Sequence, residues 1–239
     1  MTDPHADVPV LYAGAPLGEA TFALILTHGR GGSAEGMLPI ARNAGAMDAA
    51  LIAPRARDAS WYPHRFLDPF AMNEPSLSSA LRVIDHGVRE ALQAGIPAER
   101  IVLVGFSQGT CLSLEYAARH GRRFGGIAAL AGALMGDDAD MRPVHRPVHP
   151  AASGALAGTP VLLACGDDDV HIPEARVRQT ASWLTAQGAE VDLRIYPGLG
   201  HSIVGDQLTA LRAMVDRVRT PEAHVAAPTT PSAAPPSAI

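Results

Sequence analysis

Short runs of Val, Ile and Leu recur along the chain, and stretches in which apolar residues return every three or four positions lie between them. A short aliphatic run is typical of a strand buried in a parallel sheet, whereas the three- to four-residue spacing is typical of a helix with one apolar face. The aliphatic runs predict strands at Val8–Tyr12, Phe22–Thr27, Ala49–Ala53, Ile101–Gly105, Gly126–Ala131, Val161–Cys165 and Val191–Tyr196.

The helical spacing places helices between and after these strands. In the last of them, Leu208, Leu211 and Val215 form one apolar stripe. Ser76 is expected to cap the start of the second helix and Gly95 to stop it. Strands that alternate with helices form βαβ units, so the pattern predicts an α/β fold with a mostly parallel central sheet and helices on both faces. The helices are predicted at about residues 34–45, 76–94, 108–120, 173–187 and 206–219.

Two segments depart from this alternation. Residues 220–239 are rich in Pro, Ala and Thr with little to bury, so we expect one folded domain over residues 1–219 and a disordered tail after it. Residues 142–150 read RPVHRPVHP, and their prolines exclude a regular helix, so they are expected to form an inserted loop. Its histidines, His145 and His149, have no third ligand at a recognisable spacing, so we expect no metal site.

The composition narrows the range of functions. Apolar residues make up 47% of the chain and charged residues 18%, as in ordinary globular proteins. A formal net charge of -5 without a dense basic run argues against a nucleic-acid binder, and favours a small-molecule or protein substrate. All 19 basic residues are arginine, so catalysis by a serine–lysine pair or a Schiff base is excluded.

The cysteines and the N-terminal sequence indicate in which cellular compartment the protein is expected. Cys111 and Cys165 are too few for a disulfide framework, and we expect two buried, reduced thiols. The N-terminus has no basic segment followed by an apolar stretch, and no apolar run reaches the roughly 18 residues of a membrane helix. We therefore expect a soluble cytoplasmic protein without an integral membrane segment. The sequence does not indicate an oligomeric state.

Ser107 lies in the stretch GFSQG, between a predicted strand and a predicted helix. This is the G-x-S-x-G spacing of a nucleophile elbow, in which Gly105 and Gly109 would relieve the crowding of a sharp strand-to-helix turn. The alternative is that Ser107 is only a small residue in a tight turn. A serine hydroxyl is a poor nucleophile at neutral pH, so catalysis also needs a histidine base and a carboxylate that orients it.

Both partners occur downstream, each after a predicted strand. Residues 161–173, VLLACGDDDVHIP, contain three consecutive aspartates, and residues 195–202, IYPGLGHS, contain His201. The order Ser, Asp, His is that of the α/β-hydrolases. Because the carboxyl ends of parallel strands meet at one edge of a sheet, we expect Ser107, one of the aspartates and His201 to converge there.

Acyl transfer also requires donors for the oxyanion of the tetrahedral intermediate. One would be the backbone N–H of Gln108, the residue after the nucleophile. The other is expected from the glycine-rich residues 24–33, LILTHGRGGS, and we assign it to the N–H of Arg30. The Arg30 side chain is expected to pair with Glu35, or alternatively to select an ester that bears a negative charge. His28 is expected to brace this loop by hydrogen bonds.

Four motifs, THGRGGSAEGM, GFSQGT, GDDDVHIP and YPGLGH, in this order and spacing resemble the phospholipase/carboxylesterase branch of the α/β-hydrolases, which includes the acyl-protein thioesterases. The resemblance covers about residues 8–218. It implies the α/β-hydrolase fold without a large lid domain, and a serine hydrolase that needs no cofactor and acts on a small-molecule or lipid-like acyl ester or thioester. In that family the catalytic aspartate precedes an x-x-[VI]-P, which implies Asp169; Asp167 and Asp168 would then be turn residues.

The same resemblance implies a substrate pocket. Residues 61–81, WYPHRFLDPFAMNEPSLSSAL, resemble the acyl-pocket segment of bacterial members of the family. The implied lining residues are Trp61, Tyr62, Phe66 and Leu67, with plain core packing as the alternative. His171, beside Asp169, is either part of the site or an exposed loop histidine.

Two other functions remain open. A dienelactone-hydrolase-like enzyme shares the fold but generally uses a cysteine nucleophile, which the serine at position 107 disfavours. A hydrolase-fold protein that binds a ligand without turnover is the second alternative, because a fold does not fix a function. The chain departs from the family pattern at Arg30, where relatives usually have an apolar residue, and in the RPVH insert, so the resemblance leaves the substrate open.

Overall fold

The computed structural model describes residues 3–138 and 156–220. The RPVHRPVHP segment and all of the predicted tail except Thr220 lie outside the described residues.

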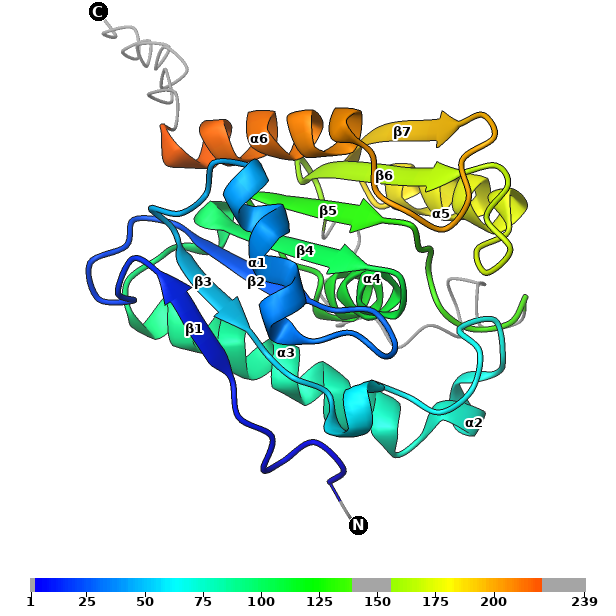
Figure 1. The fold of residues 1–239 in the computed structure, drawn as a ribbon, viewed down its shortest axis with the longest axis horizontal. Helices are drawn as coiled ribbons and strands as arrows, with labels where there is room; N and C mark the ends of the chain where they lie inside the picture. The colour runs from blue at the N-terminus through cyan, green and yellow to red at the C-terminus, as the bar shows by residue number, and fades with distance from the viewer. Residues whose placement is uncertain (1–2, 139–155, 221–239) are drawn as a thin grey trace, which may run out of the picture.

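One seven-stranded sheet forms the centre of the molecule, in the order β1-β3-β2-β4-β5-β6-β7 (Figure 1). β1 runs antiparallel to β3, and the other five neighbouring pairs are parallel. The prediction of an α/β fold with a mostly parallel sheet is confirmed. The strands are β1 (Leu11–Gly14), β2 (Ala23–Thr27), β3 (Ala50–Ala53), β4 (Ile101–Phe106), β5 (Gly126–Leu130), β6 (Pro160–Gly166) and β7 (Glu190–Tyr196).

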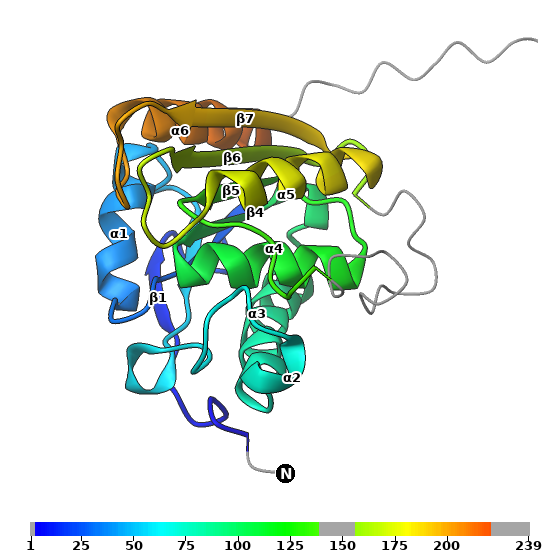
Figure 2. The ribbon, with the colours of Figure 1, turned by 90° about the vertical axis from the view of Figure 1, so that its right-hand side faces the viewer.

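Helices cover both faces of this sheet, as predicted (Figures 1 and 2). The longer helices on one face are α1 (Ala34–Asn43) and α6 (Gly205–Arg219), and those on the other are α3 (Ser76–Gln93), α4 (Gln108–His120) and α5 (Glu174–Ala186). Each face buries its own apolar cluster. The single turn α2 (Phe70–Asn73) and the 3-10 turns η1 (Arg57–Ala59) and η2 (Ala98–Arg100) are too short to leave a periodic pattern, and sequence reasoning missed them.

The first strand differs from the prediction. It begins at Leu11 and not at Val8, because Pro9 has no N–H for the ladder and its carbonyl instead accepts a hydrogen bond from Arg55 at 3.3 Å. Ser76 is the first residue of α3 rather than its cap, while Gly95 follows the helix at φ +91°, a conformation that favours glycine. Gly95 therefore lies where the helix was predicted to stop.

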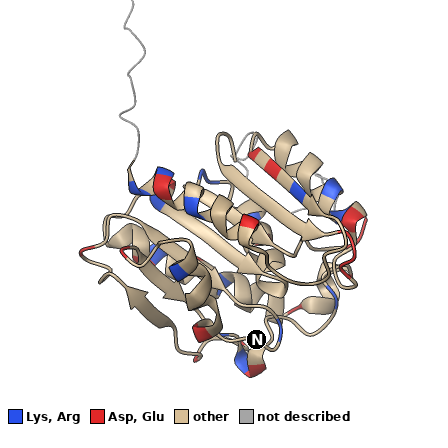
Figure 3. Cartoon of the chain, turned by 45° about the horizontal axis from the view of Figure 1, so that its top comes forward, with Lys and Arg blue, Asp and Glu red and all other residues tan. Residues whose placement is uncertain are grey.

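The carboxyl ends of the parallel strands lie at the right-hand edge in Figure 1, which faces the viewer in Figure 2. The loops after β2, β4, β6 and β7 gather there, and so does the long connection from β3 to α3. In Figure 3, basic and acidic residues are interspersed over the visible helices and loops. None of the helices in the described ranges combines the length and the apolar character needed to cross a membrane.

Candidate active site

Ser107 occupies a strained turn between β4 and α4. Its backbone has φ 55° and ψ -121°, a combination that non-glycine residues rarely adopt and that costs of order 1–3 kcal/mol. The turn is held at both ends, because Ser107 N donates to Leu130 O at 3.0 Å and Cys111 N donates to Ser107 O at 3.1 Å. This sharp turn exposes the Ser107 hydroxyl at the end of the sheet, where a substrate can reach it.

The two glycines that flank Ser107 are required by close packing. A Cβ at Gly109 would lie 2.2 Å from Thr27 O of β2, and a Cβ at Gly105 would lie 2.5 Å from Thr110 N of α4. Both separations are far inside van der Waals contact, so a larger residue at either position would push α4 away from the sheet. The glycines thus set how closely α4 approaches the strands below the serine.

Three side chains from different loops form a continuous hydrogen-bonded chain. His201 Nε2 lies 2.8 Å from Ser107 Oγ, and His201 Nδ1 lies 2.7 Å from Asp169 Oδ2. An ionised carboxylate only accepts, so Nδ1 carries the proton and Nε2 is left to accept from the serine hydroxyl. The His201 side chain is 20% exposed and that of Asp169 is fully buried. Asp169 thus orients the imidazole, and the exposed part of the ring remains accessible to a substrate.

Asp169 is the one of the three consecutive aspartates that faces His201. Its Oδ1 accepts from the amides of His171 at 2.9 Å and Ile172 at 3.1 Å. Burial raises the pKa of the Asp169 carboxyl, but the hydrogen bonds from His201 and these amides lower it by more, and the net pKa lies below the usual aspartate value. Asp167 instead accepts from Gly198 N at 2.7 Å, and Asp168 is exposed on the loop.

A buried thiol also contacts the Asp169 carboxylate. Cys165 Sγ lies 3.6 Å from Asp169 Oδ2, the oxygen that accepts from His201. Burial, together with the charge of Asp169, raises the pKa of Cys165 to about 12, so the thiol stays protonated and donates. Cys111 is likewise buried and free, and burial raises its pKa to about 12.

Two backbone amides beside Ser107 are free to bind an oxyanion. Within residues 3–138 and 156–220, neither Arg30 N nor Gln108 N donates to a protein acceptor. The next two amides of the glycine-rich loop are engaged, because Gly31 N donates to Ala59 O at 2.7 Å and Gly32 N donates to Gly29 O at 3.0 Å. The amide of Arg30 is thus among those of this loop that have no acceptor in the described residues, and its assignment as an oxyanion donor stays a prediction.

His28 braces the glycine-rich loop, which confirms that expectation. Its Nδ1 donates to Gly29 O at 2.8 Å, and Ala56 N donates to its Nε2 at 3.1 Å, so the ring is neutral with the proton on Nδ1. Burial lowers the pKa of His28, which keeps the ring in this form. The carbonyl of His28 accepts from the indole N–H of Trp61 at 2.8 Å.

The side chains of Arg30 and Gln108 both bind one stretch of backbone, residues 61–64. Gln108 accepts from Trp61 N at 2.9 Å and donates to Tyr62 O at 2.8 Å. The Arg30 guanidinium donates to the carbonyls of residues 62, 63 and 64 at 2.8–3.0 Å. The expected pairing of Arg30 with Glu35 is wrong, because Glu35 pairs with Arg55 and the Arg30 fork is occupied by carbonyl oxygens.

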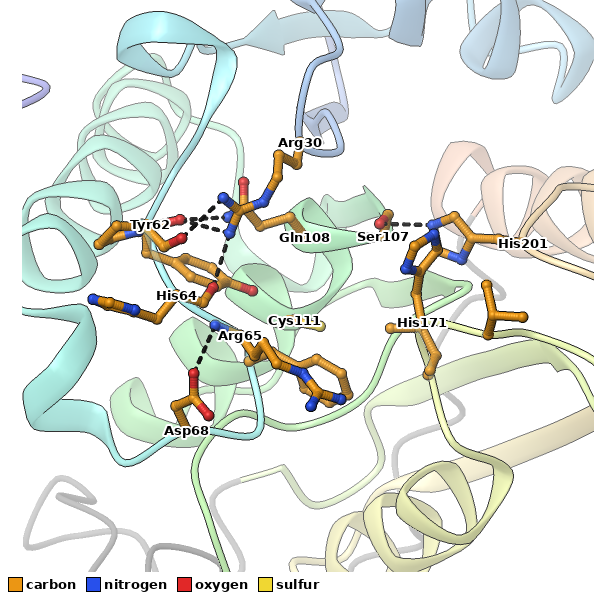
Figure 4. Close-up of a pocket in the computed structure, with 14 residues that line it drawn as sticks. Arg30, Tyr62, His64, Arg65, Asp68, Ser107, Gln108, Cys111, His171 and His201 are labelled. Atoms are coloured by element: carbon orange, nitrogen blue, oxygen red, sulfur yellow. Dashed lines mark hydrogen bonds between the residues drawn. The ribbon is translucent and has the colours of Figure 1, made fainter.

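A pocket of about 880 Å³ opens in front of Ser107 (Figure 4). Of the residues predicted to line it, Tyr62, Phe66 and His171 do so, and the His171 ring stands edge-on to His201 at 4.9 Å. Its full lining is Arg30, Tyr62, Pro63, His64, Arg65, Phe66, Asp68, Ser107, Gln108, Cys111, Val170, His171, Ile172 and His201.

Two predicted lining residues lie elsewhere. Trp61 is fully buried and packs against His28, with ring centroids 4.9 Å apart, so it supports the site from beneath. Leu67 is half-buried and packs against the apolar core. The indole N–H of Trp61 is directed to His28 O and Leu67 packs on the core, so neither side chain lines the cavity that Tyr62 and Phe66 face.

Several lining residues were missed from the sequence. Cys111 lies one helical turn after Ser107, and that spacing places two residues on one face of a helix. Val170 and Ile172 flank His171 directly, so their positions could have been inferred. Arg65 left no signal, because the irregular connection that contains it has no periodicity. Among the described residues, no cluster of three or more His, Cys, Asp or Glu side chains could hold a metal ion, and His145 and His149 lie outside them.

Comparisons with known proteins place these features in context. The sequence profile of the family described as Phospholipase/Carboxylesterase matches residues 14–218. An acyl-protein thioesterase 1 of Gibberella zeae is 34% identical over 137 residues, which cover 56% of this chain and 55% of that protein. A probable carboxylesterase of Oryza sativa subsp. japonica is 30% identical over 233 residues, which cover 87% of this chain and 81% of that protein. The chain spans about half to somewhat under two thirds of the length of the curated thioesterases it matches.

A solved structure is similar over nearly the whole described fold. The crystal structure of a phospholipase/carboxylesterase from Dyadobacter fermentans DSM 18053 is 34% identical, with a TM-score of 0.80. The match covers 87% of this chain and 96% of that chain. The sheet order and the two helical layers described above are therefore those of an α/β-hydrolase.

Proposed function

Because the chain belongs to the phospholipase/carboxylesterase family, we propose that it is a serine hydrolase that cleaves carboxylic esters or thioesters through a covalent acyl-enzyme. The observation that carries the proposal is the hydrogen-bonded chain from Ser107 through His201 to Asp169. It supplies, in one place, a nucleophile, a base within hydrogen-bond distance and a carboxylate that fixes the tautomer of that base.

In the first half of the reaction, Ser107 Oγ attacks the acyl carbon while its proton passes to His201 Nε2. The negative charge that develops on the carbonyl oxygen is stabilised by the free amides of Arg30 and Gln108, each worth about 3 kcal/mol. Asp169 stabilises the imidazolium that forms, which then protonates the departing alcohol or thiol. The product of this half is an ester between Ser107 and the acyl group.

In the second half, water takes the place of the alcohol or thiol. His201 removes a proton from the water, the resulting hydroxide attacks the acyl-serine, and the same two amides hold the new oxyanion. Collapse of the intermediate returns the proton to Ser107 Oγ and releases the carboxylic acid. The cycle balances with the ester and one water as reactants, and it uses no group beyond the described residues.

The pocket favours acyl groups of short or moderate length. Its volume of about 880 Å³ suits a small ester, and the sequence shows no insertion of the size of a lid domain. The names of the curated relatives include both thioesterases and carboxylesterases, so thioesters belong to the proposed substrate range. The two buried free thiols fit the reducing cytoplasm in which we propose that it acts.

A fluorophosphonate probe tests this proposal directly. Wild-type protein should gain the mass of one phosphonyl adduct, and peptide mapping should place it on Ser107. Ser107→Ala should take up no probe and should hydrolyse p-nitrophenyl butyrate about 10³-fold more slowly or worse. Ser182→Ala, an exposed serine of α5, serves as the matched control and should behave as wild type.

The same experiment separates the alternatives. A protein that binds a ligand without turnover would hydrolyse no ester, and a cysteine nucleophile would place the label on Cys111 or Cys165. Either result, or an undiminished rate in Ser107→Ala, would remove the proposed function.

A further inference from the structure

The wall of the pocket carries charge of the opposite sign to the whole chain. The formal net charge of the chain is -5. The described lining residues nevertheless include two arginines, Arg30 and Arg65, and a single carboxylate, Asp68. Positive charge in a concave site attracts anions and orients them. The pocket wall is therefore suited to a substrate that itself bears a negative charge.

Arg65 is fixed at its backbone and free at its guanidinium. Its N–H donates to Asp68 Oδ2 at 2.9 Å, and its carbonyl accepts from Asn73 Nδ2 at 3.1 Å. Asn73 is fully buried, so the base of the Arg65 side chain is held in place. In the described part of the chain, no hydrogen-bond or ion-pair partner contacts the guanidinium. Figure 4 shows this side chain extending toward the part of the pocket that contains His171.

Two other arginines at this edge of the sheet, Arg30 and Arg55, differ from Arg65 because their guanidinium groups have partners. The Arg30 guanidinium donates to three backbone carbonyls, and Arg55 pairs with Glu35. Carbonyl dipoles hold the Arg30 fork in place but do not neutralise its charge. Arg30 therefore contributes a fixed positive field, and Arg65 contributes donors that are ready to bind.

An apolar surface belongs to the same cavity. Phe66, Cys111 and Ile172 are buried residues that line it, and Val170 is 84% exposed at its rim. Such a surface accommodates methylene groups, whereas the planar guanidinium fork matches a carboxylate with two parallel hydrogen bonds. A substrate that starts at Ser107 and ends at Arg65 would thus combine an ester, a short methylene chain and a carboxylate.

We propose that the site takes esters or thioesters whose acyl chain ends in a carboxylate a few methylene groups from the scissile carbonyl, with Arg65 as the residue that binds this carboxylate. The proposal rests on the proposed function, since it names a substrate class for the same site. It identifies Arg65 as a determinant of specificity and leaves the chemical step to Ser107 and its partners.

Matched esters test this inference. The mono-p-nitrophenyl ester of adipic acid carries the acyl carboxylate, and its methyl ester is a neutral substrate of nearly the same length. The ratio of their kcat/KM values isolates the effect of the charge. We expect wild type to prefer the charged ester, and Arg65→Gln to lower the ratio by about five- to tenfold, the range of one charge-assisted, partly exposed contact. Arg65→Lys should recover part of the preference.

Two controls sharpen the result. Arg42→Gln makes the same change of net charge in the last turn of α1, away from the pocket lining, and should leave the ratio at its wild-type value. Added salt should reduce the wild-type preference, because screening weakens attraction between exposed charges.

The outcomes distinguish this inference from the proposed function. If the neutral ester is hydrolysed and Ser107 is labelled, but the ratio is the same in wild type and Arg65→Gln, the carboxylate inference is wrong and the hydrolase proposal stands. The hexanoate esters of p-hydroxybenzoate and of its methyl ester carry or lack the charge on the leaving group. A preference that depends on Arg65 for this pair alone would overturn the assignment to the acyl chain.

Discussion

The serine turn and the connection from β3 to α3 meet at the same pocket but owe their shapes to different forces. The turn between β4 and α4 is defined by backbone sterics, because Gly105 and Gly109 sit where any Cβ would collide with main-chain atoms. The connection, residues 54–75, has little regular structure, and its shape depends on hydrogen bonds from side chains far away in the sequence. The serine turn can thus be recognised from a short sequence motif, whereas the shape of the pocket wall depends on side-chain contacts that no short motif records.

The difference predicts how each region responds to substitution. Changes at Ser107, Asp169 or His201, the proposed catalytic residues, should act on kcat, and changes at the glycines of the serine turn should act on global stability. Changes that loosen residues 54–75 should act on substrate binding and local order, since that connection packs on the core through a few anchors such as Trp61 and Asn73.

The largest effect is expected on the chemical side of this comparison. Asp169→Asn should lower kcat on p-nitrophenyl butyrate by about 10⁴-fold, because an amide no longer holds His201 in the tautomer that accepts the serine proton. Steady-state kinetics with a melting curve would show a large rate loss with the fold retained. Asp168→Asn, on the same loop, is the control, and an equal loss there would contradict the assignment of Asp169.

Gly109→Ala probes the steric basis of the serine turn. A Cβ 2.2 Å from Thr27 O forces α4 off the sheet, and we expect a loss of about 3 kcal/mol in the free energy of unfolding. For a chain of this size that lowers Tm by about 6–12 °C. Gly205→Ala, whose added Cβ meets nothing within 4 Å, should leave Tm nearly unchanged. Equal melting temperatures for the two variants would refute the packing argument.

The hold of Arg30 on residues 62–64 can be tested separately from its charge. Arg30→Lys keeps the charge but lacks the planar fork, so it should loosen this backbone almost as much as Arg30→Gln. In both variants we expect faster hydrogen exchange over residues 61–73. We also expect kcat/KM for the neutral ester to fall about tenfold, which corresponds to a loss of about 1.4 kcal/mol in transition-state stabilisation. Wild-type exchange and rate in Arg30→Lys would show that charge alone matters.

The smallest effect concerns pH. His5 is buried, donates from Nε2 to Trp61 O at 2.9 Å and accepts at Nδ1 from Arg57 N at 3.1 Å, which requires the neutral ring. Burial lowers the pKa of His5 and of His28 in the folded state. As the pH falls below about 6.5, the unfolded chain therefore binds protons first, and stability declines until the lower folded pKa is reached.

Chemical denaturation between about pH 7.5 and pH 5 measures this slope, to which one histidine contributes at most about 1.4 kcal/mol per pH unit. His5→Asn should reduce the slope, whereas His86→Asn, at an exposed position of α3, should not. A slope that is identical in all three proteins would show that the buried ring does not govern acid stability.

The sequence was informative where geometry is imposed locally. The spacing of Gly105, Ser107 and Gly109 and the positions of Asp169 and His201 directly after strands could be inferred because parallel strands deliver their ends to one edge. The assignment of an oxyanion donor to Arg30 rests on the glycines around it and stays a prediction. These features depend on residues within a few positions of each other or on the order of the strands.

The pocket wall could be predicted only in part. Trp61 and Leu67 have the apolar character of lining residues, but their direction depends on contacts with His28 and the core that no local pattern encodes. Arg65 and the pairing of Arg55 with Glu35 depend in the same way on neighbours distant in sequence. A side chain's type can be read from the chain, whereas its partner in an irregular segment is decided by the tertiary fold.

The contacts that fix residues 61–64 have a consequence for how this protein could acquire new selectivity. Gln108 and Arg30 bind only main-chain atoms of that stretch, so its exposed side chains, Pro63 and His64, are not needed to keep it in place. Substitutions at those two positions can therefore change the pocket lining while the hydrogen bonds that fix the backbone of residues 61–64 are kept. Such substitutions at Pro63 and His64 are expected to change substrate specificity without disturbing the fold of this stretch.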